Sequence, residues 1–129
     1  MAAKPQETSK AEFSVLKALW RVKQGTVADV RSKYTELFGT EPAYTTVTTL
    51  LTRLVNKGMV KVEKDRQPFI FTPVFKEESV LRSRLRQFIE TVFDGDTHAL
   101  VLKLVEDESL TSDDLRRIEK KLESDKGEP

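Results

Sequence analysis

The stretch Thr40–Pro73, TEPAYTTVTTLLTRLVNKGMVKVEKDRQPFIFTP, predicts a helix followed directly by a β-hairpin. Its apolar residues recur at the spacing of one helix face, which is typical of a helix packed on a core; they are Val47, Leu50, Leu51, Leu54 and Val55. Gly58 should end this helix, because glycine readily takes the left-handed conformation of a C-terminal cap. Val60 and Val62 then alternate with charged residues, and a β-rich run follows the turn-forming residues 65–68, which predicts two strands.

The other face of this helix is rich in threonine. Threonine has a low helix propensity because its branched side chain loses rotamer freedom, so a cluster of them needs a compensating role. The cluster consists of Thr45, Thr46, Thr48, Thr49 and Thr52. Short hydroxyl side chains can bind phosphate oxygens and contact thymine methyl groups. The pattern therefore predicts a DNA-contacting helix, with an ordinary solvated helix surface as the alternative.

Length and composition exclude several classes of protein. The chain has 129 residues, enough for one or two small units with a modest core. It has no apolar run that could cross a membrane, and its N-terminal MAAKPQETSK lacks the apolar stretch of a signal peptide. We therefore expect a cytoplasmic protein with no membrane partner. Because cysteine is absent and no catalytic constellation is recognisable, we expect no enzyme activity, metal or cofactor.

The net charge of +1 conceals an uneven distribution. Residues 1–75 carry 12 Lys/Arg against 7 Asp/Glu, whereas residues 76–129 carry 10 against 14. Part of the basic excess falls on the predicted helix and hairpin, at Arg53, Lys57, Lys61, Lys64 and Arg66. Positive charge gathered on one element is expected of a nucleic-acid surface.

Two further helices precede the threonine-rich helix. Ser9 and Glu12 have the spacing of a capping box and begin a helix that runs to about Val22, and Thr26 can cap a second helix through about Phe38. The apolar face of the second helix is formed by Val27, Val30, Tyr34, Leu37 and Phe38. Three helices and a hairpin in this order predict a winged helix-turn-helix domain over residues 1–75, with the threonine-rich helix in the recognition position.

Residues 76–129 form a nearly continuous helical pattern with long apolar seams. The seam residues are Leu81, Leu85, Phe88, Ile89, Val92, Leu100, Val101, Leu104, Leu115, Ile118 and Leu122. Three short helices cannot enclose so many large side chains, whereas packing against a second copy would bury them. We therefore predict a helical dimerisation domain, and the fold class is mainly α with a small β-wing.

Four segments carry a resemblance to a known family: AEFSVLKALW (11–20), AYTTVTTLLTRLVNKGMV (43–60), FIFTP (69–73) and FDGDTHALVLKLVED (93–107). In this order they resemble the penicillinase repressor (BlaI/MecI) family of bacterial transcriptional repressors, from about Ala11 to Glu123. The resemblance implies a homodimer whose two winged helices bind the half-sites of a near-palindromic, double-stranded operator DNA. The C-terminal helices would hold the two copies together.

Two departures from the family pattern bear on the release signal. The copper-responsive branch carries a C-terminal cysteine motif, which this chain lacks. The antibiotic-responsive branch is inactivated by cleavage at an Asn-Phe step, and the aligned pair here is Lys103 and Leu104. The resemblance therefore does not establish release by a sensor protease, and such a partner stays an open question.

The expected DNA-contacting residues lie on the recognition helix and the wing. A recognition helix leads with its N-terminal residues, which favours Thr45, Thr46, Thr48 and Thr49, and the family's contact face matches Thr45, Thr46, Thr48 and Arg53. Arg53 could contact a guanine or clamp a phosphate. Tyr44 could stack on or bind the DNA backbone, or instead close the core.

In the wing, Lys61, Lys64 and Arg66 could bind the flanking DNA backbone; the alternative is an ordinary charged edge strand. For the whole chain, the alternative function is a winged-helix protein-interaction module without specific DNA binding.

Overall fold

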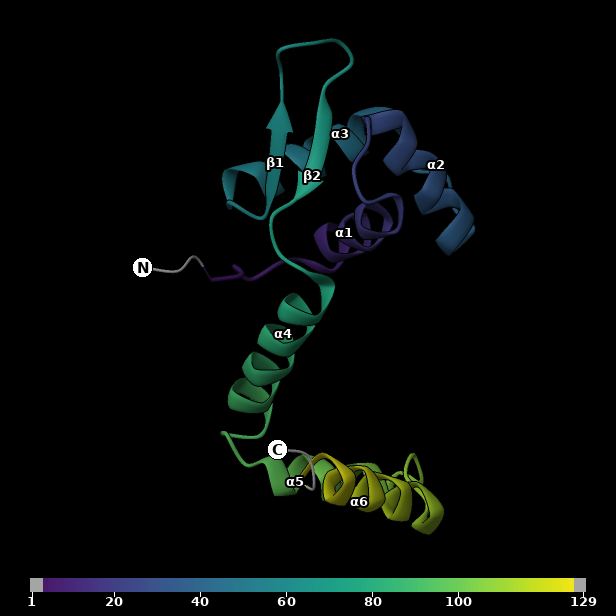
Figure 1. The fold of residues 1–129 in the computed structure, drawn as a ribbon, viewed down its shortest axis with the longest axis vertical. Helices are drawn as coiled ribbons and strands as arrows, with labels where there is room; N and C mark the ends of the chain where they lie inside the picture. The colour runs from purple at the N-terminus through teal and green to yellow at the C-terminus, as the bar shows by residue number, and fades with distance from the viewer. Residues whose placement is uncertain (1–3, 127–129) are drawn as a thin grey trace. The chain divides into compact units, whose positions relative to one another are not determined.

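The computed structural model describes residues 4–126. The chain divides into two compact units, Met1–Arg84 and Leu85–Pro129. The elements of the described residues, labelled in Figure 1, are α1 (Lys10–Val22), α2 (Val27–Phe38), α3 (Tyr44–Asn56), β1 (Val60–Glu63), β2 (Ile70–Pro73), α4 (Glu77–Val92), α5 (Thr97–Glu106) and α6 (Ser112–Lys126). The predicted fold class, mainly α with a small β-wing, is confirmed.

The first two helices begin at the caps predicted from the sequence, Ser9 and Thr26, and each forms a capping box. The Ser9 hydroxyl accepts from the Glu12 N–H at 3.1 Å, and the Glu12 carboxylate accepts from the Ser9 N–H at 2.7 Å. Thr26 and Asp29 repeat this reciprocal pair at the start of α2. Each box satisfies N–H groups that the first turn of a helix leaves without an intrahelical partner.

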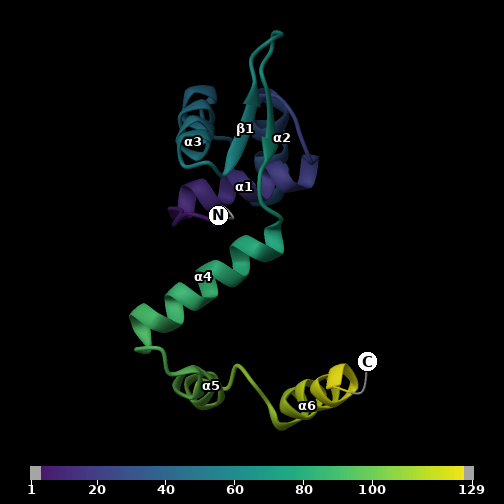
Figure 2. The same cartoon turned by 60° about the vertical axis from the view of Figure 1, so that its left-hand side comes forward.

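The wing is a two-stranded antiparallel hairpin, and its strand β2 is also bonded to the turn between α1 and α2. The strand register runs from Val60 opposite Pro73 to Glu63 opposite Ile70, so β2 begins one residue later than the predicted run that starts at Phe69. Figure 2 shows the tip of the hairpin extending past α2 and α3. On the other edge of β2, Gly25 and Phe71 exchange both backbone hydrogen bonds, at 3.0 and 2.8 Å.

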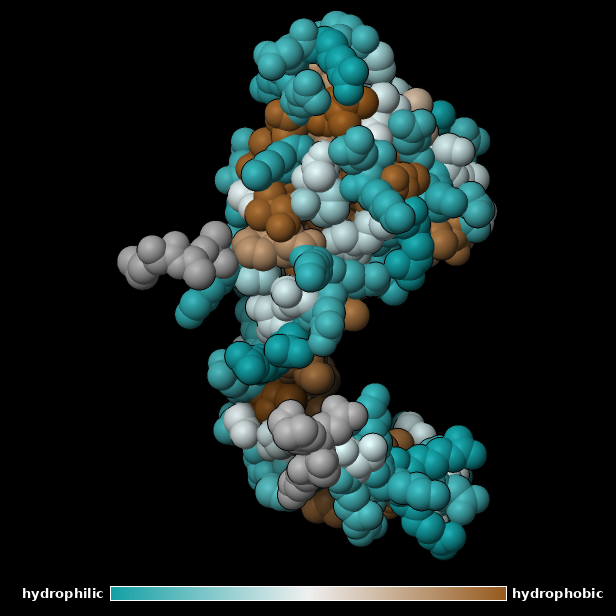
Figure 3. Space-filling model, in the orientation of Figure 1, coloured by the Kyte–Doolittle hydropathy of each residue, from teal (hydrophilic) through white to brown (hydrophobic). Residues whose placement is uncertain are grey.

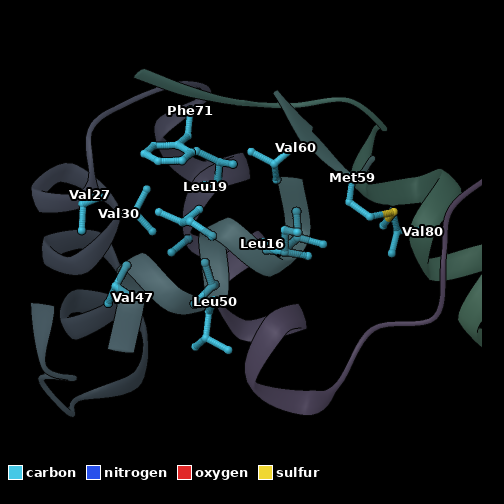
Figure 4. Packing of buried hydrophobic residues seen from close by; sticks show 14 residues of the cluster. Leu16, Leu19, Val27, Val30, Val47, Leu50, Met59, Val60, Phe71 and Val80 are labelled. Carbon is cyan, nitrogen blue, oxygen red and sulfur yellow. The ribbon is translucent and has the colours of Figure 1, made fainter. Parts of the chain in front are cut away.

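The core of the N-terminal unit lies between α1, α2, α3 and the hairpin (Figure 4). Four of the five predicted apolar residues of α3 are buried, and the fifth, Val55, is partly buried against the core. The central side chains of the cluster are Val15, Leu16, Leu19, Val30, Val47, Leu51 and Leu54. The predicted apolar face of α2 is only partly correct. Leu37 and Phe38 are exposed because the last turn of α2 lies beyond this core, and the ring of Phe38 packs on Tyr34 at 4.7 Å instead.

The first turns of α4 belong to the N-terminal unit. Val80 is buried beside Met59 (Figure 4). The Arg84 guanidinium donates to the Thr8 carbonyl and hydroxyl at 2.9 and 2.6 Å and lies 4.5 Å from the centre of the Phe13 ring. The boundary between the two units along the chain therefore falls within α4, whereas the change of sequence pattern at residues 75 and 76 precedes this helix.

The C-terminal unit contains the end of α4 with α5 and α6. No two of these helices pack extensively on each other within the described residues. Most seam residues are therefore exposed in the single chain, with Leu85 at 53% and Leu122 at 55%, and Figure 3 shows hydrophobic surface over this unit. Between residues 4 and 126, no helix has the length and apolar character needed to cross a membrane.

Candidate nucleic-acid interface

The outward face of α3 gathers three threonines and one arginine. Thr45, Thr46, Thr49 and Arg53 are all exposed, and together with Leu50 they line a shallow depression of about 250 Å³. The apolar side of the same helix is buried, so packing fixes which residues face outward. Arg53 makes no ion pair with any residue in the range 4–126. This face therefore offers three hydroxyls and a charged guanidinium to a ligand.

Thr48 differs from the other predicted threonines. Its hydroxyl donates to the Tyr44 carbonyl at 3.0 Å, and the residue is half-buried on the side of α3 that faces the hairpin. A hydroxyl bonded in this way keeps lone pairs for accepting but has no proton left to donate. Tyr44 itself is 52% exposed, so it does not close the core.

A groove of about 350 Å³ separates α3 from the wing. Its lining residues are Val27, Tyr44, Thr48, Thr52, Val55, Asn56, Val62, Lys64, Gln67, Pro68, Phe69 and Phe71. The Lys64 ammonium lies at its rim, 6.0 Å from the centre of the Phe69 ring. The three predicted wing cations, Lys61, Lys64 and Arg66, are exposed, although Arg66 approaches Glu63 to 4.0 Å.

The N-terminus of α3 has no side-chain cap. Its N-cap residue is Ala43, which cannot accept a hydrogen bond through its side chain. By contrast, Ser9, Thr26 and Asp96 cap α1, α2 and α5 through their side chains. The first N–H groups of α3 therefore stay open, at the end of the helix where its dipole favours an anion.

Two contacts that cannot be read from the sequence hold the ends of α3 in place. At the start, Arg31 of α2 binds the residues just before the helix, with its Nε 2.7 Å from the Pro42 carbonyl oxygen. At the end, Lys57 donates to Glu12 Oε1 at 2.7 Å and to the Glu7 carbonyl at 2.9 Å. Lys57, counted among the basic residues of this region, is therefore occupied by contacts within the protein. Neither contact has a signal in sequence spacing, because the partners are distant along the chain.

The carboxylate of Glu12 is buried, and its pKa is shifted by its surroundings. Burial raises its pKa, but the hydrogen bonds from Lys57 and from the Ser9 N–H outweigh burial and hold the pKa below its ordinary range. Its second oxygen, Oε2, is buried without a hydrogen-bond partner in the part of the chain that the structure describes. Glu12 is thus a structural anion beneath α3, not part of the outer face.

The exposed groups of α3 and the wing indicate which kind of ligand this surface could bind. Residues 4–126 contain no group of three or more potential metal-ligating side chains. The exposed hydroxyls, the guanidinium, the wing cations and the open helix N-terminus are all groups that bind phosphate or base edges.

Comparison with known proteins finds a matching family model, similar repressors and a solved structure with the same fold. A family model described as Penicillinase repressor matches residues 8–124. The methicillin resistance regulatory protein MecI of Mammaliicoccus sciuri is similar, with 29% identity over 118 residues that cover 92% of this chain and 94% of that protein. The penicillinase repressor of Bacillus licheniformis is 24% identical over 120 residues, covering 93% and 92%. A solved structure described as the hsRosR-S4 complex shares the fold with a TM-score of 0.53 at 17% identity, covering 81% of this chain and 91% of its own.

Proposed function

We propose, because this chain belongs to the penicillinase repressor family, that it acts in the cytoplasm as a homodimer that binds a near-palindromic operator and blocks transcription. The family consists of transcriptional repressors and not of enzymes, and the similar proteins named above are a regulatory protein and a repressor. The observation that carries the proposal is the outward face of α3, where Thr45, Thr46, Thr49 and Arg53 lie together on the side opposite the buried apolar residues.

In this proposal α3 enters the major groove with its N-terminal end leading. Thr45, Thr46 and Thr49 would contact base edges and the nearest phosphates, and the open N–H groups at the start of the helix would bind a phosphate. Arg53, one turn further along, would contact a guanine or a phosphate. Tyr44 and Thr48, on the side of α3 toward the wing, would contact the DNA backbone.

The wing would supply affinity without sequence choice. Lys61, Lys64 and Arg66 are exposed on the hairpin and its tip, where cations would bind phosphates of the flanking duplex. Such contacts release counterions, so they make binding depend on salt concentration.

The C-terminal seam would hold two copies together. We assign DNA binding to the winged helix of residues 1–75 and dimerisation to the helical residues 76–129. The seam comprises Leu81, Leu85, Phe88, Ile89, Val92, Leu100, Val101, Leu104, Leu115, Ile118 and Leu122, eight of which are exposed in the single chain. An exposed apolar surface of this extent marks an interface, and a twofold dimer would place two copies of α3 on half-sites about 34–36 Å apart.

The release step would not depend on cleavage between Lys103 and Leu104. This pair lies inside α5, where Lys103 approaches Glu106 to 3.7 Å and Leu104 is half-buried. Exposed loop tips are the preferred sites of proteolysis, and an ordered helix is not. A sensor protease acting here would first have to unwind α5.

A gel-shift titration of the full chain tests the proposal, with the duplex found upstream of its own gene and a random duplex of equal length as the two probes. We expect the upstream duplex to bind at least about 10³-fold more tightly at physiological salt. Equal binding to both probes would contradict operator recognition and favour the protein-interaction module. A monomer by light scattering at micromolar concentration would contradict the homodimer.

A further inference from the structure

The turn before α3 is held from outside by Arg31, a residue of α2. Its Nε donates to the Pro42 carbonyl at 2.7 Å, and one terminal nitrogen lies 3.1 Å from Glu41 Oε1. The guanidinium therefore binds two consecutive residues, Glu41 and Pro42, at the same time. A flat fork with several fixed donors can do this, whereas the single ammonium of a lysine cannot match both positions.

The start of α3 has no side-chain cap to fix it. The side chain of a normal N-cap residue fixes the point where a helix begins by binding its first turn, but the N-cap of α3 is Ala43, which makes no such bond. Pro42 and Glu41 directly precede Ala43, and Tyr44, Thr45 and Thr46 directly follow it. The Arg31 contacts therefore hold the turn that directly precedes the residues that lead α3.

We propose that Arg31 is a positioning residue for operator recognition: it sets where α3 begins and so aims Thr45 and Thr46, without contacting DNA itself. This inference rests on the proposed function. A side chain that reads a base must be held within about half an ångström of its working geometry. Because two of the three guanidinium nitrogens are already engaged, Arg31 acts through the turn.

The test compares the DNA binding of full-length Arg31→Lys, Arg31→Gln and Glu41→Gln with that of the wild type. The probes are the duplex found upstream of its own gene, here called the operator duplex, and a random duplex, each over a series of salt concentrations. The matched control is Lys33→Gln, which removes a cation of the same helix whose ion pair, within residues 4–126, is with Glu36 at 3.0 Å. Thermal unfolding of each variant shows whether the fold is retained.

We expect Arg31→Lys and Arg31→Gln to lower operator affinity by about tenfold while leaving random-duplex affinity and the salt slope unchanged. Glu41→Gln, which keeps the Pro42 bond, should give a smaller loss in the same direction, and Lys33→Gln should give none. If Arg31 bound a phosphate directly, Arg31→Lys would keep the wild-type affinity. Arg31→Gln would weaken binding to both duplexes and reduce the salt slope by about 1.

Either this direct-contact pattern or an unchanged ratio of operator affinity to random-duplex affinity in Arg31→Lys would overturn the positioning role of Arg31. The proposed function would then still stand. A wild-type protein that binds both duplexes equally overturns the proposed function together with this inference. The amide hydrogen exchange of residues 44–47 in the DNA-free protein gives a second readout. The exchange should be faster in Arg31→Lys than in Lys33→Gln, and equal rates in the two variants would count against the positioning role of Arg31.

Discussion

Lys57 Nζ lies 2.7 Å from Oε1 of Glu12, so the C-terminal cap of α3 is bound to the first turn of α1. The Glu12 side chain is only 3% exposed. The same carboxylate also accepts from the Ser9 N–H and completes the capping box of α1. One buried anion therefore joins the start of one helix to the end of another.

This pair predicts a specific loss of stability in acid. The pKa of Glu12 is lower in the folded chain than its ordinary value, so its contribution to stability is full above about pH 4.3, the ordinary glutamate pKa. The contribution is lost as the pH falls through the lower folded-state pKa. Urea unfolding of the wild type and of Glu12→Gln should show a stability gap that is constant near neutrality and narrows on acidification. A gap that stays constant down to about pH 2 would contradict this prediction.

Removing the other partner should be costly at neutral pH. Lys57→Met leaves a buried carboxylate without its cation, and we expect a loss of about 1–3 kcal/mol in the free energy of unfolding. Lys61→Met, on the exposed surface of β1, is the matched control and should change stability by less than about 0.5 kcal/mol. Equal effects of the two substitutions would show that the Lys57 contact does not stabilise the fold.

Gly25 should not tolerate a methyl group. A Cβ at this position would lie 2.9 Å from both Cβ and Oδ2 of Asp29, the residue that completes the capping box of α2. The backbone cannot easily move away, because Gly25 is bonded to Phe71. We expect Gly25→Ala to lower the free energy of unfolding by about 1–3 kcal/mol. Gly39→Ala, where nothing lies within 4 Å and only the positive φ of +74° is strained, should cost about 1 kcal/mol. Urea unfolding curves measure both, and a smaller loss for Gly25→Ala would contradict the steric argument.

Base readout by α3 should separate specific from non-specific binding. We expect Thr46→Ala and Arg53→Ala each to weaken operator binding by about 1–3 kcal/mol and to leave random-duplex binding nearly intact. Lys64→Ala in the wing should weaken both duplexes alike and reduce the salt slope by about 1. Gel-shift titrations at several salt concentrations measure these effects. Equal losses on both duplexes for Arg53→Ala would assign Arg53 to the phosphate backbone instead.

A charge in the C-terminal seam should disrupt the dimer. Ile118 is 48% exposed on α6 in the single chain, and Ile118→Glu would bury a carboxylate without a partner in the proposed interface. We expect sedimentation velocity to show a shift toward monomer. Lys120→Glu places the same side chain on the opposite face of α6 and should leave the dimer intact. A dimer that survives Ile118→Glu unchanged would exclude this seam as the interface.

Local signals made much of the N-terminal unit predictable from the sequence. The caps at Ser9 and Thr26, the stop at Gly58 and the apolar face of α3 all depend on residues within a few positions of each other. The structure confirms the two caps, the stop and four of the five residues of that face. The identities of the DNA-contacting side chains and the dimer seam stay predictions. The structure adds their exposure and grouping.

What the sequence did not reveal depends on contacts between distant residues. Phe71 binds Gly25, Arg31 binds Pro42 and Lys57 binds Glu12, and periodicity carries no information about such pairs. The exposure of Leu37 and Phe38 has the same origin, because helical spacing defines a face but not how far along the helix that face is covered.

The threonine-rich α3 owes its position to Arg31 at one end and Lys57 at the other, and its helicity to the leucines and valine beneath it. The residues that would read DNA take no part in either. Substitutions among Thr45, Thr46 and Thr49 could therefore retarget the protein to a different operator while folding is maintained. The outer threonines of α3 can therefore change in evolution without loss of the residues that hold the helix in place.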